Sequence, residues 1–200
     1  MVFGKRKTAL LLAGMFILGG CGSTANVRVM PNFPSVVSEP KAIHAAIVFD
    51  QEFSSYVARP NEKTTIDIGA AQVDLLSKAF LGLFEQIEIV SSREQVGAGI
   101  ELVIIPSVRE VQLSTPSDSY LNVYEVWIKY NLDIETVEGE AIDSWFMPAY
   151  GKTPDSFMLS RTDAIEEAAV VALRDAGAKL LLDFFRIPSV YSWMEREQKL

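Results

Sequence analysis

The chain has 200 residues, of which 49% are hydrophobic, and a formal net charge of −8 from 18 basic and 26 acidic side chains. This length is enough for one domain with a proper hydrophobic core. The excess of acid repels phosphate backbones, so we expect no nucleic acid among its partners. Because there is a single cysteine, no disulfide can form within the chain, and stability must come from burial alone.

The first 20 residues have the three parts of a secretory signal peptide. Lys5, Arg6 and Lys7 form a basic start, Thr8–Leu18 is apolar, and small residues follow. The apolar run is far shorter than the ~20 residues that a membrane-spanning helix needs, so we expect cleavage rather than a retained span. Because the segment contains three cations and no acid, its removal would change the formal net charge from −8 to −11.

Leu18, Gly19 and Gly20 stand directly before Cys21, the only cysteine of the chain. This ending resembles the lipobox of bacterial lipoproteins. The resemblance implies a diacylglycerol on the Cys21 thiol, cleavage before Cys21, and acylation of the new amine with a chain such as palmitate. Two or three acyl chains anchor a protein stably, whereas one binds only marginally. Gly22 occupies the position where inner-membrane retention in enteric-type bacteria commonly uses Asp, so the resemblance implies the outer membrane, on its periplasmic face.

Residues 21–40 are predicted to be a lipidated tether that connects the anchor to the rest of the chain. Pro31, Pro34 and Pro40 lie in it without a clean period, which favours an extended segment. The alternative is a first strand packed on a sheet, which the apolar residues of the segment, Val27, Val29 and Phe33, would permit. Residues 41–200 are predicted to form a single periplasmic domain, since no repeat or second domain boundary is visible.

The first half of this domain is predicted to contain a β-α-β unit. Residues 42–49 are apolar and β-branched, as in a buried strand, and residues 64–68 alternate as in a short strand. A helix is predicted from Gly69 to about Gln86, and a strand follows at 87–90. The buried stripe of this helix should consist of Val73, Leu76, Phe80, Leu83 and Phe84. Gln72 is among the residues expected to face away from the core.

Residues 100–150 are predicted to form antiparallel strands. Because Pro106 cannot donate to a ladder, we place it at a bulge or on an edge, between strands at 100–105 and 108–113. The stretch 124–135 alternates six times between apolar and polar residues, which indicates a strand with one wet face. Glu138-Gly139 is the predicted turn into its partner at 141–150. The apolar face carries Tyr124, Val126, Ile128, Tyr130, Leu132 and Ile134.

A long helix is predicted from a cap at Ser160 or Thr162 to about Phe185. Its acidic residues near the start and basic residues near the end suit the helix dipole. Its small-residue stripe, suited to close docking on a sheet, consists of Ile165, Ala169, Ala172, Ala176 and Leu180. Residues 189–200 are expected to form a last turn that folds back with Tyr191 and Trp193.

This order of elements predicts an α+β fold with one mostly antiparallel sheet and two main helices packed on one face. The layout resembles several small accessory lipoproteins of Gram-negative envelopes, among them the lipopolysaccharide-assembly lipoprotein and the α/β lipoproteins of curli and exopolysaccharide export. Residues 126–132 (Val-Trp-Ile-Lys-Tyr-Asn-Leu) form a sheet strand typical of that layout. The resemblance implies an accessory component of an envelope export or transport complex.

No familiar catalytic or metal-binding pattern is present in the sequence. His44 is the only histidine, which leaves the usual zinc patterns incomplete. There is no Gly-x-Ser-x-Gly, phosphate-binding loop or dinucleotide fingerprint. The carboxylates Asp133 and Glu135 share a strand face, where a solvated surface is the commoner explanation. We therefore expect no cofactor, no metal and no enzymatic activity.

Two tryptophans are candidate contacts for a protein partner. Trp127 points to the polar face of its strand, and Trp145 would lie near it if the hairpin pairs as drawn. Trp is enriched in interface hot spots, although packing under a loop or helix is the alternative for Trp127. Two other functions stay open: a carrier of lipid or another apolar ligand in a groove between sheet and long helix, and a hydrolase of envelope polymers.

Overall fold

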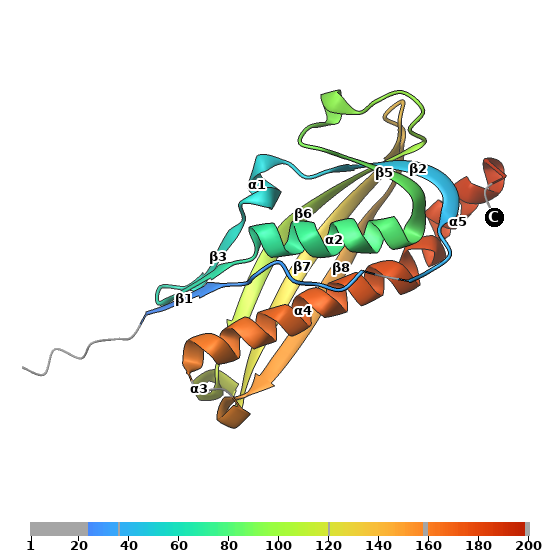
Figure 1. Ribbon diagram of the computed structural model, residues 1–200. Helices are drawn as coiled ribbons and strands as arrows, with labels where there is room; N and C mark the ends of the chain where they lie inside the picture. Colours follow the sequence, from blue (N-terminus) through green and yellow to red (C-terminus); the bar gives the residue numbers. More distant parts are fainter. Residues whose placement is uncertain (1–23, 36, 120, 158–159, 199–200) are drawn as a thin grey trace, which may run out of the picture.

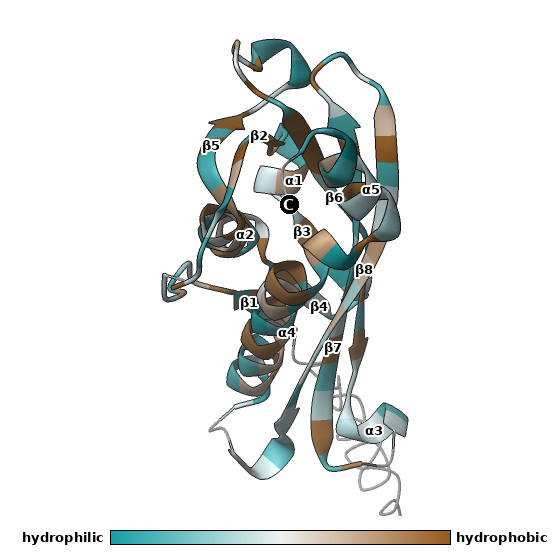
Figure 2. Cartoon of the chain, turned by 90° about the vertical axis from the view of Figure 1, so that its right-hand side faces the viewer, coloured by the Kyte–Doolittle hydropathy of each residue, from teal (hydrophilic) through white to brown (hydrophobic). Residues whose placement is uncertain are grey.

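The computed structural model describes residues 24–35, 37–119, 121–157 and 160–198. The predicted signal peptide and Cys21 lie outside these ranges. A five-stranded sheet with the order β5-β2-β6-β7-β8 organises the fold, and helices α2 (Gly69–Leu83) and α4 (Arg161–Asp183) cover one of its faces (Figure 1). Its strands are β2 (Lys41–Val48), β5 (Phe84–Val90), β6 (Leu102–Ser114), β7 (Val123–Thr136) and β8 (Ala141–Pro154). Seen from the side, both helices stand on the same side of β6, β7 and β8 (Figure 2).

The prediction of an α+β fold with two main helices on one face is confirmed. The sheet, however, is mixed rather than mostly antiparallel, because β2 pairs in parallel with both β5 and β6. Helix α2 carries the chain back along the sheet, so the strand that follows it can run parallel to β2. The sequence suggested that 64–68 and 87–90 flank this helix as one unit, but the strand after the helix pairs with β2.

Pro106 lies where only one neighbour of β6 remains. β2 pairs with β6 over Leu102–Ile104, whereas Pro106 is opposite Leu132 of β7, beyond the last residue paired with β2. A shift in register follows between Val108 and Glu110. Pro106 therefore lies on a stretch of β6 that is locally an edge, as predicted, but the bulge lies further along the strand. The predicted division into strands at 100–105 and 108–113 is wrong, because β6 runs unbroken through Pro106.

A second sheet of three short strands lies at one end of the molecule (Figure 1). β1 (Ala25–Arg28) pairs in parallel with β4 (Thr64–Asp67), which pairs in antiparallel fashion with β3 (Val57–Asn61). β1 also contacts α4. Residues 25–28 therefore follow the alternative of a packed first strand rather than an extended tether, because β4 and α4 provide the surface that its apolar side chains need. The buried residues of this region are Ala25, Val27, Val29 and Phe33.

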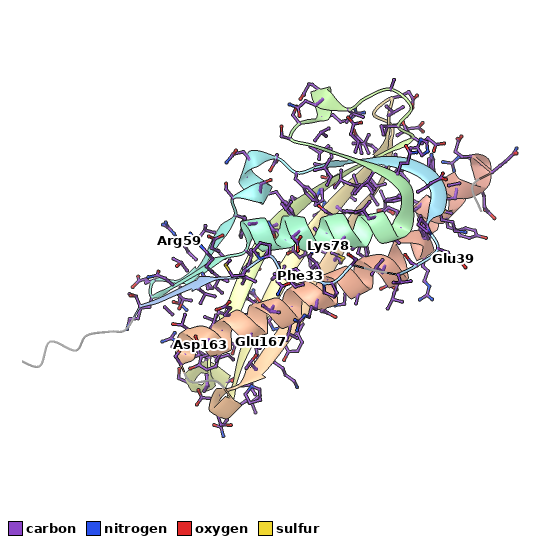
Figure 3. The ribbon with its side chains drawn as sticks, viewed as in Figure 1. Phe33, Glu39, Arg59, Lys78, Asp163 and Glu167 are labelled. Atoms are coloured by element: carbon purple, nitrogen blue, oxygen red, sulfur yellow. The ribbon has the colours of Figure 1, made fainter. Side chains whose placement is uncertain are left out.

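Residues 29–35 and 37–40, here called the strap, run along α2 from β1 to β2 (Figure 1). The backbone of Phe33 is held on both sides: its N–H donates to Asp74 Oδ2 at 3.3 Å, and its carbonyl accepts from Lys78 Nζ at 2.6 Å. Lys78 also pairs with Asp74 at 2.9 Å. The hydroxyl of Ser38 donates to the carbonyl of Gly82. Figure 3 shows Phe33 beside Lys78. These contacts attach the strap to the domain along most of α2.

The core lies between the sheet and the helices. The six apolar residues predicted for β7 are all buried, and so is the small-residue stripe of α4. Small side chains allow α4 to approach β8 very closely. A Cβ on Gly151 of β8 would lie 2.1 Å from the carbonyl oxygen of Ala168 on α4. Gln72, predicted to face away, is fully buried instead, because its amide bonds to groups of β7 and of the segment before β3.

The C-terminal part folds back as predicted. Ser160 caps α4 by accepting from the N–H of Asp163, and α5 (Pro188–Arg196) buries Trp193 and Met194 while Tyr191 stays exposed. The remaining short elements are α1 (Gln51–Ser54), α3 (Pro116–Ser119) and the 3₁₀ turns η1 (Arg93–Gln95), η2 (Asp155–Phe157) and η3 (Phe184–Arg186). Within the described ranges, none of the helices is apolar over enough residues to pass through a bilayer.

Candidate functional site

The outer face of the main sheet, opposite the helices, carries a group of aromatic and apolar side chains. Neighbouring residues of a strand point to opposite faces. Trp127 of β7 therefore shares the outer face with Phe146, Pro148 and Tyr150 of β8, whereas Tyr130 and Met147 point into the core. We call these four residues, Trp127, Phe146, Pro148 and Tyr150, the aromatic patch. Trp127 is 40% exposed and Phe146 53% exposed.

Trp127 is held by its cross-strand neighbour. Trp127 and Tyr150 are directly opposite in the ladder, and their ring centroids lie 4.3 Å apart with a tilt of 42°. The hydroxyl of Tyr150 donates to Glu125 Oε1 at 2.5 Å. This hydrogen bond, helped by partial burial and the charge of Glu125, raises the pKa of Tyr150 to about 12. The backbone and the hydrogen bond to Glu125 thus hold the ring of Tyr150 in place, and the indole of Trp127 packs on this ordered ring.

Polar pairs border the patch on its β6 side. Lys129, next to Trp127 on the same face of β7, donates to Glu110 Oε2 of β6 at 2.6 Å. Hydrogen bonds from Lys129 and Gln112 lower the pKa of Glu110. Towards the other end of the strand, Asn131 donates to Asp133 Oδ1 at 2.8 Å. Lys129 and Asn131 stand opposite Pro148 and Phe146 in the ladder, so satisfied polar groups border the patch along its β6 side.

The free edge of β8 is closed by α4. The N–H of Tyr150 donates to Asp175 Oδ2 at 2.9 Å, and the carbonyl of Pro148 accepts from Lys179 Nζ at 2.6 Å. Pro148 has no N–H to offer. Asp175 and Lys179 also pair with each other at 2.8 Å. A partner strand therefore cannot add to this part of the edge, and contact here would have to use the side chains of the outer face.

Trp145, the second candidate contact, lies on the opposite face from Trp127. Trp145 is opposite Leu132 in the ladder, and its ring is 6.5 Å from the ring of Phe184. The two positions are separated by five rungs of the ladder, an odd number, which places them on different faces. The expectation that Trp145 lies near Trp127 is therefore wrong, and Trp145 packs against the core.

His44 and the acidic strand residues have local partners. The imidazole of His44 is partly exposed, with Nε2 3.8 Å from Glu85 Oε2. Asp133 accepts hydrogen bonds from Asn131 and Ser144, and Glu135 pairs with Arg93. In the part of the chain that the structure describes, no three His, Cys, Asp or Glu side chains are grouped in a way that could hold a metal ion.

The sequence reasoning missed two features that support the site. The sequence predicts Tyr150 only as the last residue of a strand and Lys179 only as a basic residue near the end of a helix, and it does not single out Asp175. The spacing of Asp175 and Lys179, four residues apart, signals an ion pair. Nothing in the sequence indicates that this pair meets the backbone of β8, because that contact depends on how α4 crosses the sheet.

No protein-family model matches the chain, and no curated protein matches it significantly. Among solved structures, a protein from Helicobacter pylori described as a homolog of neuraminyllactose-binding hemagglutinin is similar, with a TM-score of 0.54 and 12% identity, over 86% of this chain and 98% of that one. At this identity the likeness shows the fold alone.

Two further solved structures are described as lipoproteins. One, from Caulobacter crescentus, has a TM-score of 0.40 and 13% identity, over 64% of this chain and 83% of that one. The other, a minor lipoprotein from Acinetobacter baumannii, has a TM-score of 0.40 and 12% identity, over 80% of this chain and 96% of that one. With such low TM-scores, these likenesses carry no argument about function.

Proposed function

We propose that this chain is a non-catalytic lipoprotein of the Gram-negative outer membrane, held on the periplasmic face through Cys21. It serves as an accessory component of an envelope export or transport complex and contacts its protein partner through the aromatic patch. The observation that carries the docking proposal is Trp127, 40% exposed on an open sheet face and packed on a fixed tyrosine.

Several features of the aromatic patch suit a docking role. Helices α2 and α4 pack on the inner face of the sheet, and among the described residues Trp127 and Phe146 keep large exposed fractions, so the patch is available for contact. A large aromatic side chain that is already ordered loses little conformational entropy when it binds. The rim pairs, such as Lys129 with Glu110, are satisfied before binding and can exclude water around the patch.

The alternative function, a lipid carrier, needs an apolar groove between the sheet and the long helix. The described side chains leave little room there. At Gly151 the backbones of β8 and α4 approach so closely that a single added carbon would collide with Ala168 and Ala172. Ala169 and Ala176 of the facing stripe are fully buried. The geometry therefore favours the accessory role.

The lipid anchor is tested by metabolic labelling in cells with a fatty-acid analogue. We expect label on the parent protein and none on a Cys21→Ser variant. Flotation of membranes should show the parent with outer-membrane markers. A Cys21→Ser variant that still takes up label would refute the anchor, and a parent that fractionates with inner-membrane markers would refute the proposed address.

The docking surface is tested by placing a photo-crosslinking amino acid at position 127 and, as a matched control, at Leu182 of α4. Leu182 is 64% exposed and lies on the helical side. In native membranes we expect one defined adduct from position 127 and none from position 182, with Trp127→Ala weakening co-purification of the same partner. Equal adducts from both positions, or none from 127, would contradict the proposal.

A further inference from the structure

The folded body begins very close to the proposed anchor. The N–H of Ala25 donates to the carbonyl of Lys63 at 2.8 Å, and Ala25 is opposite Thr64 in the parallel ladder. Ala25 and Val27 are buried. Residues 25–28 already lie in the second sheet. Only the residues between Cys21 and Ala25, here called the leash, can therefore set the distance between the anchor and the folded body.

The strap, which follows β1, is attached to the domain and cannot lengthen this leash. Asp74 and Lys78 of α2 hold the backbone of Phe33, whose ring is 4% exposed. Releasing the strap would break these contacts and expose three buried apolar side chains, Val27, Val29 and Phe33. The leash length is therefore set by the covalent chain before Ala25.

The reach of that leash is only moderately greater than the thickness of the headgroup layer. Four residues span at most ~14 Å when fully extended. The polar headgroup layer of one leaflet is about 5–8 Å thick. An acylated Cys21 at the inner boundary of the headgroup layer would therefore keep Ala25 within about 9 Å of the outer surface of that layer.

We propose that the end of the molecule formed by β1 and the β3–β4 hairpin rests on the phospholipid headgroups. This inference rests on the proposed lipidation of Cys21. The opposite end, with α5, then points away from the membrane (Figure 1).

The charges of this end suit an anionic surface. Arg59 and Lys63 are exposed on the hairpin, and Arg28 is exposed on β1, where it pairs with Asp67 at 3.3 Å. Figure 3 shows Arg59 at this end of the molecule. Glu62 and Asp67 offset two of these three cations, so the hairpin and β1 together carry a net charge of +1 on a chain whose overall charge is −8. Such cations near a leaflet are attracted by anionic lipids.

A fluorescence measurement on the lipidated full-length protein tests this orientation. Because lipidation consumes the thiol of Cys21, an introduced cysteine is the only reactive thiol. A fluorophore is attached to Glu62→Cys on the hairpin or, as the matched control, to Glu138→Cys in the β7–β8 turn. Both parent residues are exposed and acidic. The β7–β8 turn lies beside α5, since Thr136 and Glu140 share a shallow depression with Trp193 and Arg196.

The labelled proteins are reconstituted in phosphatidylglycerol-containing vesicles with a headgroup-attached nitroxide quencher. We expect quenching at position 62 to be at least threefold stronger than at position 138. Equal quenching, or stronger quenching at 138, in protein that floats with the vesicles would overturn the orientation while leaving the anchor intact. Protein that fails to float with the vesicles would instead refute the anchor, and the orientation with it.

A spacer variant tests the leash itself. Twenty Gly and Ser residues inserted after Ser23 would add a mean reach of about 25 Å. We expect quenching at position 62 to fall at least twofold in this variant, while flotation with the vesicles is unchanged. Quenching that stays at the parent level would overturn the inference that the short chain holds this end against the membrane.

Discussion

Tyr130 of β7 donates its hydroxyl hydrogen to Oε1 of Gln72 on α2 at 3.1 Å, and both side chains are fully buried. The amide nitrogen of Gln72 in turn donates to the carbonyl of Phe53 at 2.7 Å. Burial raises the pKa of Tyr130 above its ordinary value, which favours the protonated hydroxyl that donates this bond. One glutamine thus connects the sheet, the helix layer and the segment before β3.

We predict that Tyr130→Phe and Gln72→Leu each destabilise the fold by about 1–3 kcal/mol, because each leaves a buried polar group without its partner. The loss of unfolding free energy in the double variant should be smaller than the sum of the two single losses, by about 0.5–3 kcal/mol, since the removed groups share one hydrogen bond. Urea unfolding followed by circular dichroism measures all three values. Strict additivity would show that the bond contributes nothing.

A second prediction concerns the contact between α4 and β8. Gly151→Ala should cost more than about 3 kcal/mol or prevent folding, because the added carbon would lie 2.1 Å from the backbone of Ala168 and 2.3 Å from that of Ala172.

Gly177→Ala on α4 is the matched control, since the three atoms nearest to its added carbon all belong to the flexible side chain of Leu75, the closest at 3.1 Å. The free energy of unfolding of this variant should stay within about 1 kcal/mol of the parent value, because the gain in helix propensity offsets the tight contact. Thermal unfolding of the two variants side by side makes the comparison. Similar melting temperatures for both would contradict the close packing of α4 on β8.

A third prediction concerns the protected edge of β8. Asp175→Ala removes the acceptor for the N–H of Tyr150 and should cost about 1 kcal/mol. It also uncovers an edge N–H, so the variant should self-associate more at high concentration. Asp175→Asn keeps an acceptor oxygen and should remain close to the parent. Light scattering across a concentration series measures the association, and equal behaviour of the two variants would exclude this role for Asp175.

A fourth prediction concerns Tyr150 at alkaline pH. Its pKa is raised from 10.0 to about 12, chiefly by the hydrogen bond to Glu125. The folded state therefore holds this proton between pH 10 and pH 12, where an unfolded tyrosine would have lost it. The resulting contribution to stability is fully present below pH 10 and disappears as the pH rises to about 12.

The ultraviolet absorbance of tyrosinate, compared between the parent and Tyr150→Phe, isolates this ionisation. In Glu125→Gln the carboxylate acceptor is gone, and the step assigned to Tyr150 should move towards pH 10. A step that stays in place in Glu125→Gln would show that Glu125 does not set it.

The sequence predicts best those elements whose character depends on nearby residues. The alternation along 124–135 reports directly on a strand with one buried face, and each of its apolar members is buried. The cap at Ser160 and the alanine stripe of α4 are likewise local signals. These features required no knowledge of which element would lie opposite.

Contacts between distant elements could not be predicted in the same way. The pairing partner of β1 begins 39 residues later along the chain, at Thr64, so a proline-containing segment looked like a tether. Gln72 was placed on the outer side of its helix, since its partners Phe53 and Tyr130 become neighbours only in the folded chain. The register of the β7–β8 ladder decides on which face of the sheet Trp127 and Trp145 lie. The alternation of apolar and polar residues alone does not give that register.

The contact between β1 and α4 joins the first described strand to the last long helix. Because synthesis proceeds from the N-terminus, Val27 lacks its final neighbours on α4 until residues 161–183 have been made. Structures dominated by such distant contacts close slowly. We therefore expect β1 to be among the last elements to reach its final packing, although it is the first described strand of the chain.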